Sequence, residues 1–224
     1  MTYKILGNPL SPFTRKVALF AAEMGLNTDL TLVNPYAPPD GFETISPLKR
    51  VPVLQANGFT LNDSSAICAY LNAAHPAHTA LFPTEPEHLG HALWIEEYAD
   101  TALFSEISTG VFRPIFINEM RGLPIDTETV KASVAEHLPP LLTYLETQIS
   151  GKDWFCGGAI SIADVSVYSQ MANLLHSKCL PDGNRFPYLM KHFERISSRL
   201  AAVGLYEAEL LYLEQVRASL RSSA

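Results

Sequence analysis

Hydrophobic and polar positions alternate with two different periods in the first 75 residues. Tyr3–Leu6 is a short apolar run that stops at the breaker segment Asn8-Pro9-Leu10, which indicates a strand followed by a turn. Ser11-Pro12 then combines an N-cap hydroxyl with proline at the first helical position. Apolar residues follow at spacings of three and four, which predicts a helix that buries one face: Phe13, Val17, Phe20, Ala21 and Met24.

A second strand and a hairpin follow this helix. Residues 28–33 alternate Leu30 and Leu32 with polar neighbours, and a helix between two such strands predicts a right-handed βαβ unit with parallel strands. Residues 38–46 are expected to form a loop or a short helix. Two brief strands, 51–54 and 59–61, are joined through Asn57-Gly58, a strong hairpin-turn pair. A helix opened by Asp63 completes a four-stranded mixed sheet covered by helices.

Beyond residue 76 the strand pattern almost disappears. Residues 77–86 are rich in Pro, Thr, His and Glu and are predicted to be a linker, and residues 87–224 to be an all-helical domain. Pro139-Pro140 lies within a long apolar stripe, where we expect a kink or a restart of the helix. Ser161-Ile162-Ala163-Asp164 is a capping-box pattern with Asp in place of Glu.

Composition narrows the class of protein. Of 224 residues, 47% are hydrophobic and 17% charged, so a large buried core is expected. The net charge of −7, without a cluster of Lys and Arg, argues against a nucleic-acid partner. Three widely spaced cysteines indicate reduced thiols, and neither a signal peptide nor a membrane-spanning run is recognisable. We therefore expect a cytoplasmic protein without a membrane partner.

Two histidine pairs have the spacing of metal ligands. His75-x-x-His78 and His88-x-x-His91 lie in or beside the predicted linker, but no cysteine or carboxylate set completes either pair. The sequence predicts that these histidines are solvated, and it predicts no metal site.

Several local motifs resemble the glutathione transferase superfamily over essentially the whole chain. Residues 11–17 (Ser-Pro-Phe-Thr-Arg-Lys-Val) look like the first-helix entry of serine-type bacterial and plant members. Residues 50–54 resemble the basic-Val-cisPro-x-Leu segment, and residues 63–71 the acidic-Ser-x-Ala-Ile-x-x-Tyr-Leu helix start. Residues 161–164 match the capping box of the second domain, and residues 186–189 its late Pro-x-Leu segment. Lys49 and Asp63 depart from the usual Gly and Glu.

The resemblance implies a fold and a domain division. Residues 1–76 are expected to form a thioredoxin-like, glutathione-binding α/β domain with the element order β-α-β-α-β-β-α. Residues 77–86 are then the linker, and 87–224 the all-α domain. A homodimer is implied by the family alone.

The implied activity is conjugation of a glutathione thiolate to small electrophilic, apolar compounds. Glutathione is the substrate and no cofactor is expected. Because a free thiol has a pKa of about 8.5, the enzyme must stabilise the anion, and a hydroxyl at a helix N-terminus can do so. Ser11 is the candidate catalytic residue, although a serine before proline is also an ordinary N-cap. Thr14 is a weaker alternative donor.

The resemblance also assigns the substrate contacts. Val51, before a cis Pro52, would pair with the cysteinyl backbone of glutathione. Asp63 would accept from its α-ammonium group, and Ser64 would hold the γ-glutamyl carboxylate at a helix N-terminus. Arg50, or Lys49 beside it, would hold the glycyl carboxylate. Four aromatic residues are candidates for an apolar co-substrate pocket: Phe13, Phe104, Phe112 and Phe116.

Three other functions remain open at this point. The same site could reduce peroxides or disulfides with glutathione. The chain could be a regulatory protein of the same fold, as in the stringent starvation proteins that contact RNA polymerase. It could also store apolar ligands without any dependence on glutathione.

Overall fold

A four-stranded mixed sheet forms the first layer of the molecule. The computed structural model describes residues 2–222. Its strands are β1 (Thr2–Gly7), β2 (Asn27–Leu32), β3 (Val53–Ala56) and β4 (Phe59–Asn62), in the order β2-β1-β3-β4. β1 and β2 are parallel, with Ile5 opposite Leu30, whereas β3 is antiparallel to both β1 and β4. The predicted mixed sheet is confirmed, but β2 is an edge strand, and Leu30 and Leu32 are exposed.

Two helices cover this sheet. α1 (Pro12–Glu23) has Ser11 as its N-cap, and Val17 and Phe20 on its buried face are fully inaccessible to solvent. α2 (Ser64–Ala74) has Asp63 as its N-cap. The helix expected between the second and third strands is only one 3₁₀ turn, η1 (Phe42–Thr44). Prolines at 35, 38, 39 and 47 surround it, and they lack the backbone N–H groups that a longer helix would need.

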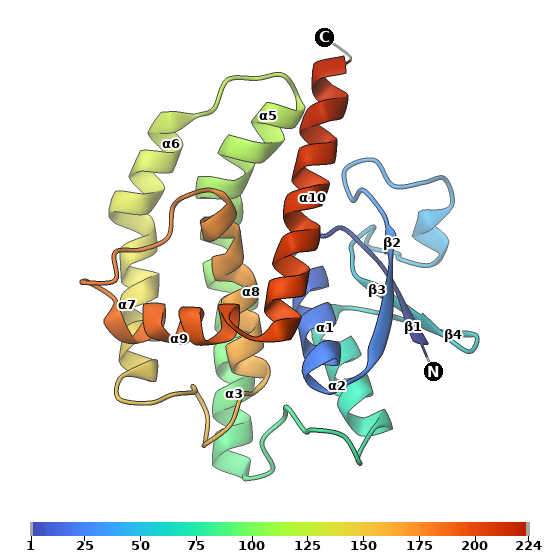
Figure 1. Cartoon of the computed structure of the whole chain (residues 1–224), viewed down its shortest axis with the longest axis vertical. Helices are drawn as coiled ribbons and strands as arrows, with labels where there is room; N and C mark the ends of the chain where they lie inside the picture. Colours follow the sequence, from blue (N-terminus) through green and yellow to red (C-terminus); the bar gives the residue numbers. More distant parts are fainter. Residues whose placement is uncertain (1, 223–224) are drawn as a thin grey trace.

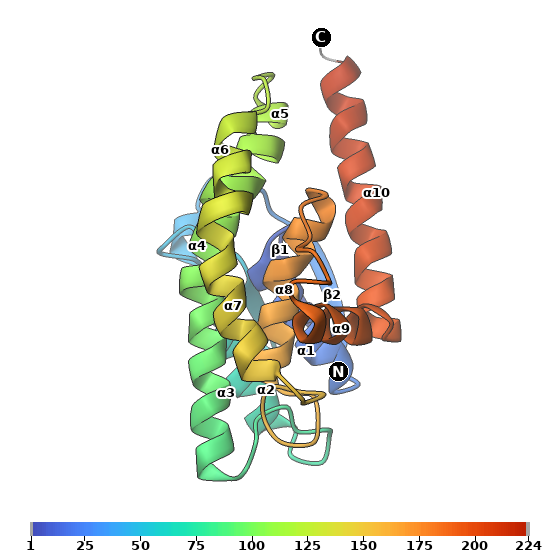
Figure 2. The same cartoon turned by 90° about the vertical axis from the view of Figure 1, so that its left-hand side faces the viewer.

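The rest of the chain is helical, as predicted, and its long helices stand side by side next to the sheet (Figure 1). The elements are α3 (Pro86–Tyr98), η2 (Ala99–Leu103), α4 (Phe104–Glu106), η3 (Ile107–Ile117), α5 (Asn118–Met120), α6 (Thr127–Ala132), η4 (Ser133–His137), α7 (Leu138–Ile149), α8 (Ile162–His176), α9 (Pro187–Ser197) and α10 (Leu200–Ser222). α10 runs along one side of the helical bundle, and α9 lies crosswise at the lower end of α10, above the lower end of α3 (Figure 2).

Wider, π-type turns occur where prolines interrupt two of these helices. η3 contains Pro114, and η4 ends directly before Leu138-Pro139-Pro140, where α7 begins. A proline cannot donate the usual backbone hydrogen bond, and wider turns allow the chain to continue as a helix. The expected restart at Pro139-Pro140 therefore takes the form of a change in helix type.

Gly110 allows η3 and the η4 segment to approach closely. A Cβ atom built on Gly110 would lie 2.6 Å from Cβ of Ser133 and 2.5 Å from Oε1 of Glu106. Real Cβ atoms essentially never come this near to their neighbours, so only glycine fits at this crossing.

α8 is the central helix of the molecule. All residues from Ile162 to Leu174 are buried, so the helix is surrounded by the rest of the molecule on every side. Its predicted capping box is present: Oδ2 of Asp164 accepts hydrogen bonds from the backbone N–H and the hydroxyl of Ser161 at 2.7 Å. The other oxygen of Asp164 accepts from Phe155 N and lies 2.9 Å from Nε2 of His192, which attaches α9 to the start of α8.

The segment between α2 and α3 is partly integrated into the core. Leu81 is 1% exposed, and its carbonyl accepts a hydrogen bond from Ile162 N at 2.8 Å. The sequence 77–86 therefore does not behave as a free linker throughout. None of the helices in residues 2–222 combines the length and the apolar character needed to cross a lipid bilayer.

Candidate active site

The loop between β1 and α1 places Ser11 at the start of a helix. Asn8 shapes this loop: its side-chain oxygen accepts from Leu10 N at 3.0 Å, and its carbonyl accepts from Ser11 N at 3.0 Å. Ser11 Oγ accepts from Thr14 N at 3.3 Å, so the serine caps α1. Because the hydroxyl acts here as an acceptor, its proton remains available for a ligand.

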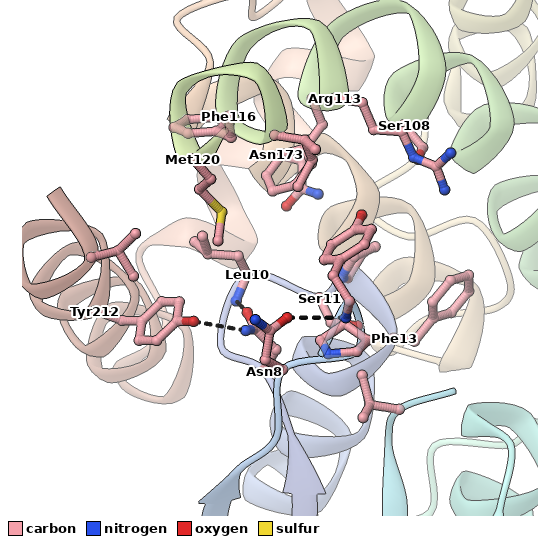
Figure 3. Close-up of a pocket in the computed structure, with 18 of the residues that line it drawn as sticks. Asn8, Leu10, Ser11, Phe13, Ser108, Arg113, Phe116, Met120, Asn173 and Tyr212 are labelled. Carbon is pink, nitrogen blue, oxygen red and sulfur yellow. Dashed lines mark hydrogen bonds between the residues drawn. The ribbon is translucent and has the colours of Figure 1, made fainter. Parts of the chain in front are cut away.

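A cavity of about 390 Å³ extends from Ser11 toward the helical half of the molecule, and we call it the Ser11 cavity. Figure 3 shows Ser11 and Phe13 on one side and Phe116 and Met120 on the other, with Tyr212 of α10 at the edge. The four aromatic residues expected at a co-substrate pocket all line it: Phe13, Phe104, Phe112 and Phe116. The rings of Phe13 and Phe104 are 4.7 Å apart, and those of Phe112 and Phe116 are 4.9 Å apart. The wall is therefore suited to an apolar or aromatic molecule.

A second cavity of about 290 Å³ lies at the N-terminus of α2, and we call it the α2 cavity. The predicted glutathione contacts all line it: Arg50, Val51, Pro52, Asp63 and Ser64. Phe13, Arg50, Val51 and Asp100 line both cavities, so the two adjoin. An elongated ligand could occupy the α2 cavity and extend one end toward Ser11.

Asp63 and Ser64 form the start of α2. Asp63 adopts a positive φ of 75°, and its Oδ1 accepts from Ser65 N and Ala66 N, both at 3.0 Å. Its other carboxylate oxygen has no partner in the described part of the chain. Ser64 is 4% exposed, and it reaches the α2 cavity at the positive end of the helix dipole. The pair therefore presents a carboxylate next to a site that favours an anion.

The Val51-Pro52 peptide bond is cis, as predicted. Val51 is 8% exposed and lines both cavities. Neither its backbone N–H nor its carbonyl has a hydrogen-bond partner within residues 2–222. Buried backbone groups are almost always hydrogen-bonded, so the free N–H and carbonyl of Val51 are suited to pair with the backbone of a peptide ligand.

Lys49 and Arg50 lie next to this peptide bond. The backbone of Arg50 is held by Ser46 Oγ, which accepts from Arg50 N at 3.1 Å and donates to Arg50 O at 2.8 Å. Both basic side chains line the Ser11 cavity, whereas Arg50 alone also reaches the α2 cavity. This placement makes Arg50 the better candidate for a carboxylate bound near Val51.

Lys16 lines neither cavity but contacts two residues that line the α2 cavity, Ser65 and Asp100, and sequence reasoning missed it. It is 1% exposed, and its ammonium group lies 2.5 Å from Glu96 Oε1, 2.5 Å from Asp100 Oδ2 and 3.0 Å from Ser65 Oγ. Burial by itself lowers the pKa of Lys16, but the negative charges around it, Asp100 foremost, outweigh burial and raise the pKa. The charged lysine therefore connects α1 with the N-terminus of α2 and with the helical wall.

Tyr212 is a second hydroxyl near Ser11, also missed in the sequence. Its oxygen accepts from Asn8 Nδ2 at 2.9 Å, and the dashed line in Figure 3 joins the two residues. This bond attaches α10 to the loop that carries Ser11. Only a contact between positions 204 residues apart could have revealed it, and no local pattern encodes such a contact.

Thr14 cannot replace Ser11 as a donor. It is 2% exposed, and its hydroxyl is buried without a partner in the described structure, directly beneath Gly7. A Cβ atom on Gly7 would lie 2.6 Å from Cγ2 of Thr14, so this side chain packs against β1 and does not face the cavity.

The thiols of the chain are not activated. Burial raises the pKa of Cys68 and of Cys179, and burial, followed by the charge of Asp164, raises that of Cys156 to about 12. All three cysteines are free and stay protonated at neutral pH. None of them lines the Ser11 cavity.

His78 and His88 are exposed, as predicted, whereas His75 and His91 are only partly exposed, and three of the four histidines have a hydrogen-bond partner in the described chain. Nε2 of His75 lies 2.7 Å from the hydroxyl of Tyr3, Nδ1 of His78 lies 2.8 Å from Met24 O, and Nε2 of His91 lies 3.0 Å from Oε1 of Gln148. These residues attach helices to their neighbours. Within residues 2–222 there is no group of three or more His, Cys, Asp or Glu side chains that could hold a metal ion.

Comparisons with known proteins agree with this architecture. Residues 10–74 match the family model for the glutathione S-transferase N-terminal domain, and residues 116–201 match that for the C-terminal domain. Glutathione S-transferase theta-1 of Mus musculus is 30% identical over 171 residues, which cover 74% of this chain and 67% of the mouse protein.

Two solved structures have the same fold. A glutathione S-transferase from Rhodospirillum rubrum has a TM-score of 0.83 at 22% identity, with 91% of each chain covered. One from Methylobacillus flagellatus, solved with GSH bound, has a TM-score of 0.74 at 24% identity, with 91% of this chain and 98% of that chain covered. The chain belongs to the glutathione transferase superfamily.

Proposed function

We propose that this chain conjugates the thiolate of glutathione to small electrophilic compounds, with Ser11 stabilising the sulfur anion. Residues 1–76 act as the glutathione-binding domain, 77–86 as the connecting segment, and 87–224 supply the outer wall of the co-substrate cavity. One observation carries the proposal: Ser11 stands at the N-terminus of α1, in the cavity that adjoins the α2 cavity, with its hydroxyl proton uncommitted.

Glutathione fits the α2 cavity with its γ-glutamyl end at α2. The free oxygen of Asp63 accepts from the α-ammonium group, and Ser64 with the helix N-terminus holds the α-carboxylate. The unpaired N–H and C=O of Val51, next to the cis Pro52, pair with the cysteinyl backbone. Arg50 binds the glycyl carboxylate. This arrangement directs the cysteinyl sulfur toward Ser11.

The chemistry then depends on lowering the pKa of the bound thiol. A hydrogen bond from the Ser11 hydroxyl and the positive end of α1 both favour the anion. A decrease of one to two pKa units corresponds to roughly 1.4–2.7 kcal/mol, which one charge-assisted bond and a helix terminus can supply. The thiolate sulfur attacks the electrophilic carbon, and the leaving group departs with its bonding electrons. Because both reactants are held in adjoining cavities, less entropy is lost when the sulfur and the electrophilic carbon come together in the transition state.

The test compares Ser11→Ala with Ser11→Thr. The alanine variant loses the hydroxyl, so the thiolate absorbance of bound glutathione should titrate at higher pH and turnover of a chlorodinitroarene should fall by about 10- to 100-fold. The threonine variant keeps a hydroxyl and the cap of α1, and it should retain most of the activity. Unchanged turnover in Ser11→Ala would remove the serine from the mechanism.

Binding is tested separately by thermal denaturation with and without millimolar glutathione. At 100 times its dissociation constant, a ligand adds about 2.7 kcal/mol to the free energy of unfolding, so the melting temperature should rise. The Ser11→Ala variant should show the same rise. If glutathione causes no shift, a regulatory or ligand-storing protein of the same fold is the better interpretation.

The proposal includes a homodimer in the cytoplasm. The family resemblance and exposed large apolar side chains, Phe59, Leu93 and Trp94, support self-association. The free cysteines support a reducing compartment. Sedimentation equilibrium should give a mass about twice the 24.7 kDa of the chain. A single species of the monomer mass at micromolar concentration would contradict the dimer.

A further inference from the structure

Arg113 is a cation without a partner on the helical wall of the Ser11 cavity. Two arginines from the helical half line this cavity, Arg113 on η3 and Arg217 on α10. Arg217 is bound to both carboxylate oxygens of Glu119, at 2.9 and 3.1 Å. Arg113 has no ion pair or hydrogen bond from its side chain in the described part of the chain. Arg113 is exposed to solvent, and Figure 3 shows it on the η3 side of the cavity, opposite Ser11, with its guanidinium group turned away from Phe116.

Asn173 adds a buried donor to the same cavity. The residue is 3% exposed and belongs to α8, and its side chain is drawn below η3 in Figure 3. Oδ1 of Asn173 accepts from Nη1 of Arg15 at 2.9 Å. A guanidinium group can only donate hydrogen bonds, so this contact fixes the orientation of the amide. Nδ2 is then a donor, and no acceptor for it exists within residues 2–222.

The charges that line the cavity favour an anion. Four cations, Lys49, Arg50, Arg113 and Arg217, face two carboxylates, Asp100 and Glu119, which gives 4 − 2 = +2. Both carboxylates are already paired, Asp100 with Lys16 and Glu119 with Arg217. The net charge of the whole chain is −7, so this positive excess is local.

The cations also divide between the two ligands. Lys49 and Arg50 lie next to Val51, at the end where the Ser11 cavity adjoins the α2 cavity, and Arg50 serves glutathione in the proposed function. Arg113 directly follows Phe112 and lies about one turn before Phe116, in the part that receives the co-substrate. An apolar body against the two rings would bring a terminal anionic group within reach of Arg113.

We propose that the Ser11 cavity selects electrophiles whose aromatic or apolar body carries a carboxylate. Arg113 binds the carboxylate, and Nδ2 of Asn173 donates to an oxygen atom of the same molecule. This inference rests on the proposed function and names its substrate class. The roles of Arg113 and Asn173 are in specificity; Ser11 keeps its part in the chemistry.

The experiment uses two electrophiles that differ only in charge, 4-chloro-3,5-dinitrobenzoate and its carboxamide. In each, the thiolate forms the C–S bond, and chloride leaves with the electron pair of the C–Cl bond. The protein should have a higher kcat/KM for the carboxylate than for the carboxamide. Arg113→Gln should lower this ratio by about tenfold, as expected for the loss of a charge-assisted contact.

Two further variants test whether the change in the kcat/KM ratio is specific to Arg113 and Asn173. Arg121→Gln is the matched control, because Arg121 is exposed, follows α5 and does not line the cavity, and the ratio should stay unchanged. Asn173→Asp keeps an acceptor for Arg15 but replaces the donor Nδ2 by a second acceptor, so the ratio should fall. An equal effect of Arg113→Gln on both electrophiles, or a wild-type ratio of one, would overturn the inference.

A binding measurement separates this inference from the proposed function. The unreactive pair 3,5-dinitrobenzoate and 3,5-dinitrobenzamide is titrated calorimetrically into the wild type and Arg113→Gln in the presence of glutathione. Weakening of about tenfold for the carboxylate alone supports the inference even if neither chloroarene is turned over, a result that would disprove only the conjugating activity. Equal affinity of both compounds for the wild type would overturn the inference.

Discussion

At the scale of single residues, the bond between Tyr212 and Asn8 holds the loop of Ser11 in place. Tyr212→Phe removes the acceptor for Asn8 Nδ2 and leaves the ring, so Ser11 becomes less well positioned. Conjugation should fall by about 3- to 10-fold, which corresponds to one neutral hydrogen bond. Steady-state kinetics measure this effect.

A control for Tyr212→Phe exists on the same helix. Tyr206 stacks on His176 at 5.2 Å and does not line either cavity, so Tyr206→Phe should leave turnover unchanged. If Tyr212 acts through Asn8, Tyr212→Phe should have little effect in an Asn8→Ala background. Fully additive losses would show that the two residues act independently.

The residues that could be predicted from the sequence lie within short motifs. Ser11, the cis Val51-Pro52 bond and Asp63 each belong to a segment of a few residues whose pattern predicts its own geometry. Lys16 and Asn173 give no such signal. Their contacts join positions 80 and 158 residues apart, so a lysine inside a helical stripe and an asparagine in a buried helix show nothing unusual before the chain is folded.

At the scale of the elements, the crossing of η3 with the η4 segment depends on Gly110. Gly110→Ala would force Ser133 and Glu106 to move and should reduce the free energy of unfolding by about 1–3 kcal/mol. Gly204, in α10, has no atom within 4 Å of an added Cβ. Gly204→Ala should therefore raise the stability by up to about 1 kcal/mol through helix propensity. Urea denaturation measures both effects. The argument is refuted if the unfolding midpoints of both variants shift in the same direction relative to the wild type.

The helices and strands could be predicted where apolar residues recur with a single helical or strand spacing. Strands and amphipathic helices such as α1 follow from their apolar spacing. The single turn η1 and the π-type segments η3 and η4 do not, because prolines in or beside them remove backbone donors and tertiary packing decides how the chain continues. The burial of α8 is not predictable in this way, because packing on all sides buries its polar residues together with its apolar ones.

At the scale of the whole molecule, two neighbouring basic residues of α1 join the two halves. Lys16 pairs with Glu96 and Asp100, and Arg15 pairs with Glu209 of α10 at 2.6 Å; both basic side chains are 1% exposed. The carboxylates that bury these charges come from residues 80 or more positions later, so local periodicity could not predict the contact.

The pairing of Glu209 gives the stability of the molecule a defined dependence on pH. Burial alone would raise the pKa of Glu209, but Arg15 and His176 outweigh burial and lower it below the ordinary value of 4.5. Ionised Glu209 is therefore favoured in the folded state. The contribution of ionised Glu209 to the free energy of unfolding is complete above pH 4.5. It is lost as the pH falls through the lowered pKa that Glu209 has in the folded state.

Glu209→Gln tests this dependence, because it leaves Arg15 buried without its counter-charge. Near pH 7 the variant should be less stable by about 3–5 kcal/mol, and the difference from the wild type should shrink as the pH falls below 4.5. Glu207→Gln, an exposed neighbour on α10, should change the stability by less than about 0.5 kcal/mol at every pH. Guanidinium denaturation between pH 3 and pH 8 measures both differences. A constant loss in Glu209→Gln across this range would mean that the hydrogen bonds of Glu209, and not its charge, hold α10 against α1.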